Sequence, residues 1–208
     1  MHIQTKVKIC GITTKKEISL INKYDIDYIG FVFAQSKRQV TVEQVIQLRK
    51  SLREYIKTVG VFVNHPIKEV NDIARKCGLD VCQLHGEEKQ WECLEVNTEV
   101  WKSISIKDEK SIIELDKFKK VNALVLDTYV KGEKGGTGKN FNWELAKGLS
   151  TKYKIALAGG LNPTNVEDAI EIVRPQIIDV SSGVETNGKK DESKIKTFVR
   201  RVKRYGFS

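Results

Sequence analysis

Eight short runs of β-branched and other apolar residues recur along the chain, and segments with a helical spacing of apolar residues separate them. The predicted strands cover residues 7–9, 28–33, 58–63, 81–84, 100–104, 123–126, 155–158 and 177–180. The connections between these strands are too long for β-hairpins, which predicts parallel strands joined by helices. Eight such units can close into a (β/α)8 barrel.

The length of the chain fits a small barrel. Its 208 residues provide about 26 for each unit, which predicts one compact (β/α)8 domain spanning residues 1–208. An open doubly wound sheet is the alternative fold. No G-x-G-x-x-G motif follows the first predicted strand, where a dinucleotide-binding sheet needs it, so the barrel is favoured.

Several helix ends are readable in the sequence. Thr14 and Glu17 have the spacing of a capping box. Asn162 followed by Pro163 predicts an N-cap with a proline in the first helical turn. Residues 193–205 predict a final helix, and the side chains expected to face inward are Ile195, Phe198, Val199 and Val202.

The net charge of +9 has two explanations, a nucleic-acid surface or a basic coat that steers a small anionic substrate. Lysine pairs are spread along the whole chain, and no basic stretch is interleaved with aromatic residues. We therefore expect a small anionic substrate and no nucleic-acid partner.

The sequence also predicts a cytoplasmic protein without a membrane partner. No apolar run approaches the roughly 18 residues that cross a bilayer, and no signal-type stretch follows Met1. Four cysteines without dense pairing indicate reduced thiols. Cys77, Cys82, His85 and Cys93 could be considered as a metal cluster, but their spacing matches no common zinc site, so no metal is expected.

In a barrel of this kind the active site lies at the carboxyl ends of the strands, so the residues directly after each apolar run are the candidates. They are Cys10, residues 35–38, His85, Gly86, Asp127, Gly159, Gly160 and residues 181–183. These residues are expected to meet at one mouth of the barrel.

Glycine and serine residues after the last two strands predict a phosphate site, because backbone N–H groups in such loops face an anion. Each stretch alone can also be only a tight turn. The glycine-rich residues 132–138 lack the G-x-x-x-x-G-K-[ST] arrangement of a nucleotide-binding loop, and we expect them to form a mobile lid.

A thiol and a carboxyl group are the candidates for proton transfer. Asp127 ends an apolar run, where burial can raise its pKa and suit it to general acid catalysis, although it can also simply cap the next loop. Lys8 and Cys10 are two residues apart and project to the same side of a strand. The lysine is expected to favour the Cys10 thiolate, a possible base or nucleophile.

Nine motifs together resemble the phosphoribosylanthranilate isomerase family of tryptophan biosynthesis. They are KICGIT (8–13), GFVF (30–33), SKR (36–38), VGVFVN (59–64), QLHG (83–86), LDT (126–128), GGTG (135–138), LAGGL (157–161) and DVSSGVE (179–185). They cover nearly the full length of the chain and occur in the family's order.

The resemblance implies a cofactor-free Amadori rearrangement of N-(5-phosphoribosyl)anthranilate. Asp127 would protonate the ribose ring oxygen as general acid, and Cys10 would remove the proton from C2 as general base. Ring opening needs a proton donor, and the iminium that it creates makes the neighbouring C–H acidic enough for a thiolate.

The resemblance also assigns binding roles. Arg38 would hold the anthranilate carboxylate, a task suited to a planar guanidinium, and Asp179 would bond a sugar hydroxyl. The phosphate cradle would consist of Gly159, Gly160, Ser182 and Gly183. His85 could make a structural hydrogen bond or contact the substrate. Lys37 departs from the family, which more often has proline there, and puts the rigidity of the Arg38 loop in question.

A different phosphosugar barrel, such as indole-3-glycerol-phosphate synthase, is the alternative enzyme. Its chemistry relies on lysine and glutamate groups at strand ends, and the pair of Cys10 and Asp127 fits isomerisation better. Barrels of the family can be monomers or homodimers, and both states stay open from the sequence.

Overall fold

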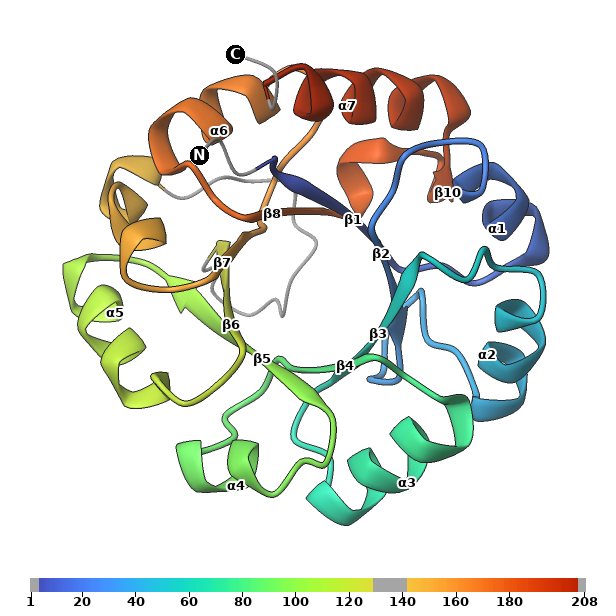
Figure 1. The fold of residues 1–208 in the computed structure, drawn as a ribbon, viewed down its shortest axis with the longest axis horizontal. Helices are drawn as coiled ribbons and strands as arrows, with labels where there is room; N and C mark the ends of the chain where they lie inside the picture. Colours follow the sequence, from blue (N-terminus) through green and yellow to red (C-terminus); the bar gives the residue numbers. More distant parts are fainter. Residues whose placement is uncertain (1–3, 129–141, 206–208) are drawn as a thin grey trace.

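The computed structural model describes residues 4–128 and 142–205, which form a closed barrel of eight parallel strands surrounded by helices (Figure 1). The strands are β1 (Lys6–Cys10), β2 (Tyr28–Val32), β3 (Lys57–Phe62), β4 (Val81–Leu84), β5 (Glu99–Ile106), β6 (Ala123–Thr128), β7 (Ile155–Leu157) and β8 (Ile177–Val180). They are hydrogen-bonded in sequence order, and β8 closes onto β1. The predicted barrel is confirmed, and the open sheet is excluded.

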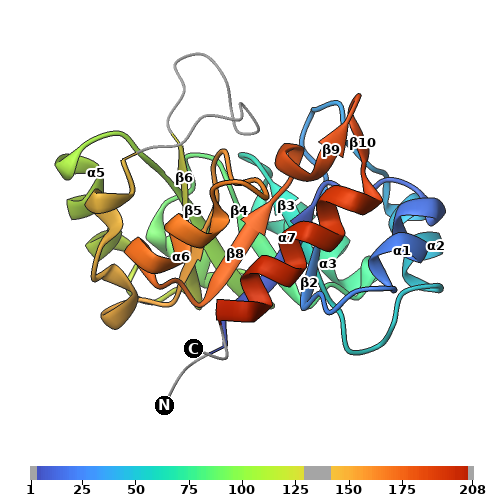
Figure 2. The ribbon, with the colours of Figure 1, turned by 90° about the horizontal axis from the view of Figure 1, so that it is seen from above.

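Helices cover the outside of the barrel. They are α1 (Lys15–Ile21), α2 (Val42–Arg49), α3 (Ile67–Cys77), α4 (Gln90–Leu94), α5 (Glu109–Ile113), α6 (Val166–Val173) and α7 (Glu192–Tyr205). Shorter 3-10 segments are η1 (Glu114–Phe118), η2 (Trp143–Ala146), η3 (Leu149–Thr151) and η4 (Ser182–Val184). A small hairpin of β9 (Glu185–Thr186) and β10 (Lys189–Lys190) follows β8 at its carboxyl end (Figure 2).

Two of the three predicted helix ends are confirmed. The Thr14 hydroxyl accepts the Glu17 N–H at 3.2 Å, and the Glu17 carboxylate accepts the Thr14 N–H at 3.0 Å. The final helix, α7, buries the expected face, Ile195, Phe198, Val199 and Val202. No helix in the described part of the chain has the length and apolar character needed to cross a bilayer.

Helix α6 starts later than the predicted N-cap at Asn162, although Asn162 does cap the turn that leads into the helix. Helix α6 begins at Val166 with Asn165 as its N-cap, while the Asn162 side chain accepts the Thr164 N–H at 2.8 Å in a preceding turn. Asn165 bonds back to the Gly160 carbonyl at 3.0 Å and to the Asn162 N–H at 2.9 Å. These bonds hold residues 160–165 as a compact loop, which delays the start of the helix.

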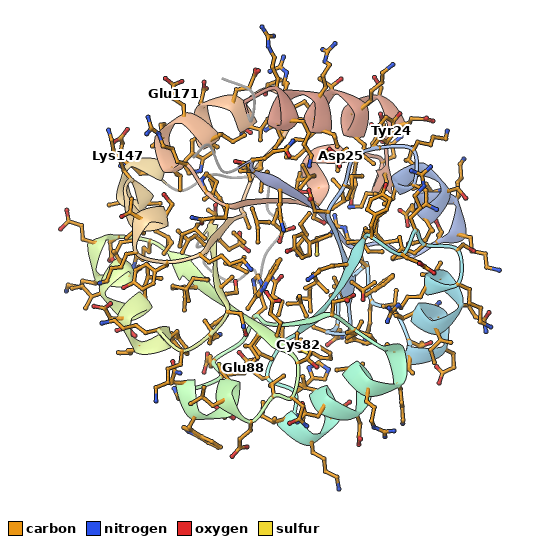
Figure 3. The ribbon with its side chains drawn as sticks, viewed as in Figure 1. Tyr24, Asp25, Cys82, Glu88, Lys147 and Glu171 are labelled. Carbon is orange, nitrogen blue, oxygen red and sulfur yellow. The ribbon has the colours of Figure 1, made fainter. Side chains whose placement is uncertain are left out.

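The alternation of side chains along each strand separates two apolar layers. Outward-facing residues such as Ile9 and Ile29 pack beneath the helices. Inward-facing residues fill the floor of the barrel, where Tyr28 and Trp101 meet edge to face with ring centroids 5.0 Å apart. Figure 3 shows side chains filling the inside of the ring of strands. The floor is therefore a packed core, as in other barrels of this type.

The same alternation carries polar side chains above this floor. Two residues beyond the apolar floor residues Val81, Trp101 and Ile177, the chain places Gln83, Ser103 and Asp179. Lys8 joins this layer from β1, where it lies in register with Asp179 of β8. The polar layer supports the mouth of the barrel.

A buried ion pair outside the barrel wall holds two loops at this mouth. The Lys102 ammonium lies 3.0 Å from a Glu88 carboxylate oxygen, and both side chains are 3% exposed. Lys102 also donates to the Gly86 carbonyl at 2.8 Å. Glu88 accepts the Asn64 N–H at 2.8 Å and the Gly86 N–H at 2.9 Å, so the loops after β3 and β4 are joined through one carboxylate.

Replacing Lys102 by methionine is expected to lower the free energy of unfolding by about 3–5 kcal/mol, because it leaves the Glu88 carboxylate buried without its counter-charge. Urea unfolding measures this loss. The control is Lys117→Met, which breaks the exposed pair with Glu114 and should have little effect. Equal losses of unfolding free energy in the two variants would show that the buried pair of Lys102 and Glu88 does not stabilise the fold more than an exposed pair does.

Candidate active site

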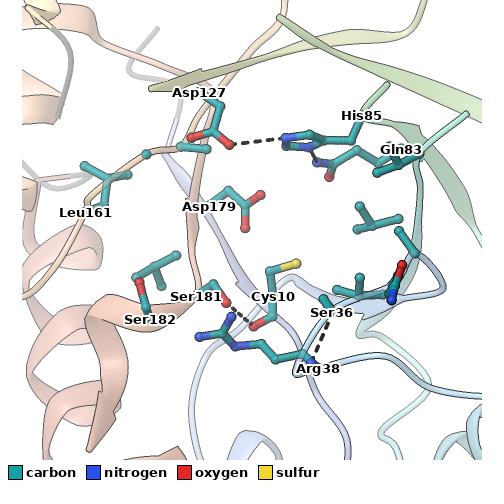
Figure 4. A pocket seen from close by; sticks show the side chains of 18 of the residues that line it. Cys10, Ser36, Arg38, Gln83, His85, Asp127, Leu161, Asp179, Ser181 and Ser182 are labelled. Carbon is teal, nitrogen blue, oxygen red and sulfur yellow. Dashed lines mark hydrogen bonds and ion pairs between the residues drawn. The ribbon is translucent and has the colours of Figure 1, made fainter. Parts of the chain in front are cut away.

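A cavity of about 480 Å³ opens at the carboxyl ends of the strands (Figure 4). All the predicted site residues except Gly183 line it: Cys10, Arg38, His85, Asp127, Gly159, Gly160, Asp179 and Ser182. They come from strands and loops on all sides of the barrel. The prediction that the residues after the strands meet at one mouth is therefore confirmed except for Lys37, Gly86 and Gly183, which do not line the cavity.

Gly183 instead lies where the loop after β8 touches the loop after β7. A Cβ atom at this position would collide with the Leu161 carbonyl. Gly183 borders a separate surface hollow with Asn162 and Lys194. Because Gly183 has no side chain, the two loops can pack closely against each other at this point. Gly183 does not line the cavity.

Small residues form one side of the cavity. Gly159 and Gly160 have φ angles of +80° and +67°, which favour glycine. A Cβ atom at Gly159 would lie only 2.8 Å from an Asp127 carboxylate oxygen. Ser181 and Ser182 line the cavity beside these glycines. This side is shaped for close approach of a ligand to the backbone.

Cys10 is a partly exposed residue at the end of β1, and its thiol is turned into the cavity (Figure 4). Its register partner on β2 is Gly30, where a Cβ atom would lie 2.6 Å from the Cys10 sulfur. Gly30 therefore provides the space that the thiol occupies. A glycine inside an apolar strand, in the GFVF motif, was the sequence signal for this close approach.

Burial and several charges together set the pKa of Cys10. Burial raises the pKa of the thiol, Lys8 and Lys190 lower it, Asp179 raises it, and the result lies above the ordinary value of 9.0. Lys8 therefore favours the thiolate as expected, but burial outweighs this effect, and the Lys8 ammonium is also shared with the Asp179 carboxylate at 2.6 Å. In the free protein at neutral pH the sulfur is mainly a thiol.

Arg38 lines the cavity and is held in place by an acidic residue, Glu185, that was not predicted from the sequence. Its Nε and Nη2 atoms lie 2.8 and 2.6 Å from the two carboxylate oxygens of Glu185. The buried Lys190 ammonium lies 2.6 Å from Glu185 Oε1 and donates to the Ser181 carbonyl at 3.1 Å. Two cations and one anion leave this cluster with one net positive charge.

The loop before Arg38 is fixed although Lys37 stands in it. The Ser36 hydroxyl accepts the Arg38 N–H at 3.2 Å, and Glu185 grips the guanidinium from the other side. Lys37 is exposed and is not among the residues that line the cavity. The substitution therefore leaves Arg38 at the cavity wall.

Asp127 is 7% exposed at the end of β6. Its Oδ1 atom accepts the Thr128 N–H at 2.7 Å, as expected for a loop cap. Its Oδ2 atom lies 3.3 Å from His85 Nε2. The carboxyl group also lines the cavity, so the loop cap is at the same time within reach of a ligand.

Asp179 presents one unused oxygen to the cavity. Its Oδ2 atom pairs with Lys8, whereas Oδ1 is buried without a hydrogen-bond partner in the described part of the protein. A buried acceptor without a partner is costly, and a hydroxyl donor from a ligand would satisfy it.

The considered metal cluster does not assemble. Cys77, Cys82 and Cys93 are separate free thiols, and burial raises the pKa of Cys82 to about 12 and that of Cys93 to about 11. Within residues 4–128 and 142–205, no three His, Cys, Asp or Glu side chains are grouped to hold a metal ion. The predicted lid, residues 132–138, lies outside the described residues.

The fold and this cavity define a (β/α)8-barrel enzyme with a small-molecule site at the carboxyl ends of its strands. A family model described as N-(5'phosphoribosyl)anthranilate (PRA) isomerase matches residues 7–201. The chain belongs to this isomerase family of tryptophan biosynthesis.

Individual relatives agree over nearly the full length. An N-(5'-phosphoribosyl)anthranilate isomerase from Thermoanaerobacter sp. (strain X514) is 52% identical over 200 residues, 95% of this chain and 98% of the relative. Monomers of the dimeric enzyme from Thermotoga maritima align with a TM-score of 0.87 and 36% identity, covering 96% of this chain and 99% of the other.

A further solved structure is that of a complex with a ligand. It is a phosphoribosyl anthranilate isomerase in complex with reduced 1-(o-carboxyphenylamino)-1-deoxyribulose 5-phosphate. It aligns with a TM-score of 0.86 and 34% identity, covering 96% of this chain and 99% of the other.

Replacing Lys8 by methionine is expected to raise the pKa of Cys10 further, because a cation that lowers it is removed and Asp179 loses its counter-charge. The rate of thiol alkylation against pH, taken as the difference between Cys10-containing and Cys10→Ser proteins, measures this pKa. Lys37→Met is the exposed control.

Two results would contradict this electrostatic account. One is an unchanged Cys10 pKa in Lys8→Met, and the other is a wild-type pKa below that of an ordinary cysteine.

Proposed function

We propose that the chain converts N-(5-phosphoribosyl)anthranilate to 1-(2-carboxyphenylamino)-1-deoxyribulose 5-phosphate by an Amadori rearrangement. The observation that carries this proposal is the pairing of the Cys10 thiol and the Asp127 carboxyl group on one cavity (Figure 4). An aldose–ketose rearrangement needs one group that gives a proton and one that takes a proton, both within reach of a single sugar.

Asp127 acts as the general acid. Its proton goes to the ribose ring oxygen, the C1–O bond breaks, and the nitrogen lone pair forms the iminium. The carboxylate that remains receives the Thr128 N–H at 2.7 Å and faces His85 at 3.3 Å. Both neighbours can stabilise the negative charge that the reaction leaves on Asp127.

Cys10 acts as the general base once its proton has left. The thiolate takes the proton from C2, the C2 electrons form the enolamine, and the iminium nitrogen becomes neutral. C1 of the enolamine then gains a proton from the Cys10 thiol, and the C2 hydroxyl loses its proton to the Asp127 carboxylate. This gives the ketone and restores both groups, so that atoms and charge balance over the isomerisation. Because burial raises the pKa of Cys10, kcat/KM should increase as the pH rises from neutral towards that pKa.

Other groups in the cavity and directly behind its wall fit the three polar parts of this substrate. The cluster of Arg38, Glu185 and Lys190, with one net positive charge, suits the anthranilate carboxylate. The unpartnered Asp179 Oδ1 suits a sugar hydroxyl. Gly159, Gly160 and Ser182 form the small-residue side that suits the phosphate, while Gly183 supports this side from behind. The ligand of the solved relative carries the same three groups.

The alternative synthase chemistry lacks its groups in this cavity. No lysine or glutamate side chain of the described residues lines the cavity wall. Lys102 and Glu88 are paired outside the barrel, and Lys8 is paired with Asp179 beneath the cavity. The isomerase reaction therefore suits the site better.

We further propose that the chain works as one catalytic domain in the cytoplasm, as a monomer or a homodimer that requires no metal or cofactor. The Thermotoga maritima relative is described as dimeric. Sedimentation of the purified chain distinguishes the two oligomeric states.

Cys10→Ser and Asp127→Asn are each expected to lower kcat by roughly 10²- to 10⁴-fold, as for loss of a general base or acid. The assay follows the loss of fluorescent substrate generated from anthranilate and phosphoribosyl pyrophosphate. Cys77→Ser and Asp72→Asn, which lie on α3 away from the cavity, should keep wild-type turnover. Inactivity of the folded wild-type protein would refute the function, and near-normal turnover of either site variant would refute its role.

Arg38→Lys is expected to raise KM by about 10-fold or more with a smaller change in kcat. Lysine keeps the charge but cannot bond Glu185 and a substrate carboxylate with one planar group. Steady-state kinetics measure both constants. Lys37→Met is the matched control and should keep the wild-type KM, whereas equal effects of the two variants would contradict the role of Arg38.

A further inference from the structure

An unbroken series of polar contacts crosses the barrel beneath the cavity. Lys8 Nζ lies 2.6 Å from Asp179 Oδ2 and 3.0 Å from Gln83 Oε1. Gln83 Nε2 lies 3.1 Å from His85 Nδ1, and His85 Nε2 lies 3.3 Å from Asp127 Oδ2 (Figure 4). The series connects one cavity carboxylate to the other through Lys8, Gln83 and His85.

The chemistry of Lys8 gives this series a direction. An ammonium group has donors and no acceptor, so the Gln83 atom that faces it must be the oxygen. The reverse orientation would place two donors against each other in a fully buried environment, at the cost of unsatisfied groups. The Gln83 amide N–H must then point at His85.

The orientation of the Gln83 amide also determines which nitrogen of the His85 imidazole carries the hydrogen. Because Gln83 donates to Nδ1, this nitrogen carries a lone pair and no hydrogen. A neutral imidazole has its one hydrogen on the other nitrogen. In His85 that nitrogen is Nε2, which faces Asp127.

We infer that Lys8 and Gln83 are positioning residues that lock His85 in its neutral Nε2–H tautomer, aimed at Asp127. This inference deepens the proposed function and rests on it for the role of Asp127. The tautomer itself is a property of the resting protein and can be measured without catalysis.

The lock determines where the proton of Asp127 can go. An imidazole with hydrogen on Nε2 cannot accept a proton from Asp127 at that nitrogen. The Thr128 N–H occupies the side of Oδ1, so the acid proton is left to point into the cavity, toward the substrate. After the transfer, the His85 N–H and the Thr128 N–H both donate to the new carboxylate.

The experiment is a long-range 1H–15N correlation spectrum of the imidazole rings in 15N-labelled wild-type protein at neutral pH. The chain has three histidines, and the His85 signals are those missing from His85→Asn. The expected pattern is that of a neutral Nε2–H ring. A neutral Nδ1–H ring, an averaged mixture of tautomers or an imidazolium would each overturn the inference.

Gln83→Glu tests the lock by reversing its direction. A glutamate can accept from Lys8 with one oxygen and from His85 with the other, so the ring is expected to become protonated at Nδ1. We expect kcat to fall about 10- to 100-fold, as for other partners that orient a histidine, with a smaller change in KM. A variant with the wild-type His85 pattern would overturn the inference.

Ser103→Ala is the matched control, because the Ser103 hydroxyl lies 3.4 Å from His85 Nε2 but is not part of the series. Its His85 should keep the Nε2–H pattern, and a shift to Nδ1–H would overturn the inference. If Gln83→Glu fails to fold, the wild-type spectrum alone decides. An Nε2–H ring together with an active Asp127→Asn protein would refute the proposed acid while leaving the tautomer lock in place.

Discussion

A fully buried ammonium in the centre of the barrel organises the site. Lys8 pairs with Asp179 at 2.6 Å across the seam between β1 and β8, where the two residues lie in register. Burial alone would lower the pKa of Lys8, but the Asp179 carboxylate outweighs it and the pKa is raised, so the charge persists at neutral pH. A buried ion pair of this kind needs further hydrogen bonds, and Gln83 supplies one. The same charge therefore contributes to barrel closure, to the orientation of His85 and to the electrostatic environment of Cys10.

Much of the fold and the site follows from the alternation of side chains. Once the eight apolar runs are assigned as parallel strands, residues two apart share a face, and the residues at strand ends meet at the mouth. Cys10, His85 and Asp127 were predictable on this basis, whereas Asp179 was assigned through the family resemblance. The (β/α)8 barrel was also predictable, because the runs are short, regularly spaced and separated by amphipathic segments.

The features that the sequence did not predict depend on contacts between residues that are far apart in the chain or on several opposing electrostatic effects. Glu185 and Lys190 lie in a hairpin after the last strand, where no strand period marks their direction, so their grip on Arg38 was missed. The net rise in the Cys10 pKa was not predicted, because burial, one anion and two cations compete there and the sequence revealed only the effect of Lys8. The start of α6 was misplaced because Asn165 bonds back into the preceding loop, a contact that adjacent residues do not reveal.

The ion pairs that hold Lys8 and Arg38 at the site connect residues that are far apart in the sequence. Lys8 and Asp179 are 171 positions apart, and Arg38 and Glu185 are 147 positions apart. During synthesis on the ribosome, Lys8 and Arg38 therefore emerge long before Asp179 and Glu185. Until then β1 cannot pair with β8, and the Arg38 guanidinium has no carboxylate partner. Ligand binding thus becomes possible only after the segment that contains Asp179 and Glu185 has been made, so that the substrate cannot assist the earlier steps of folding.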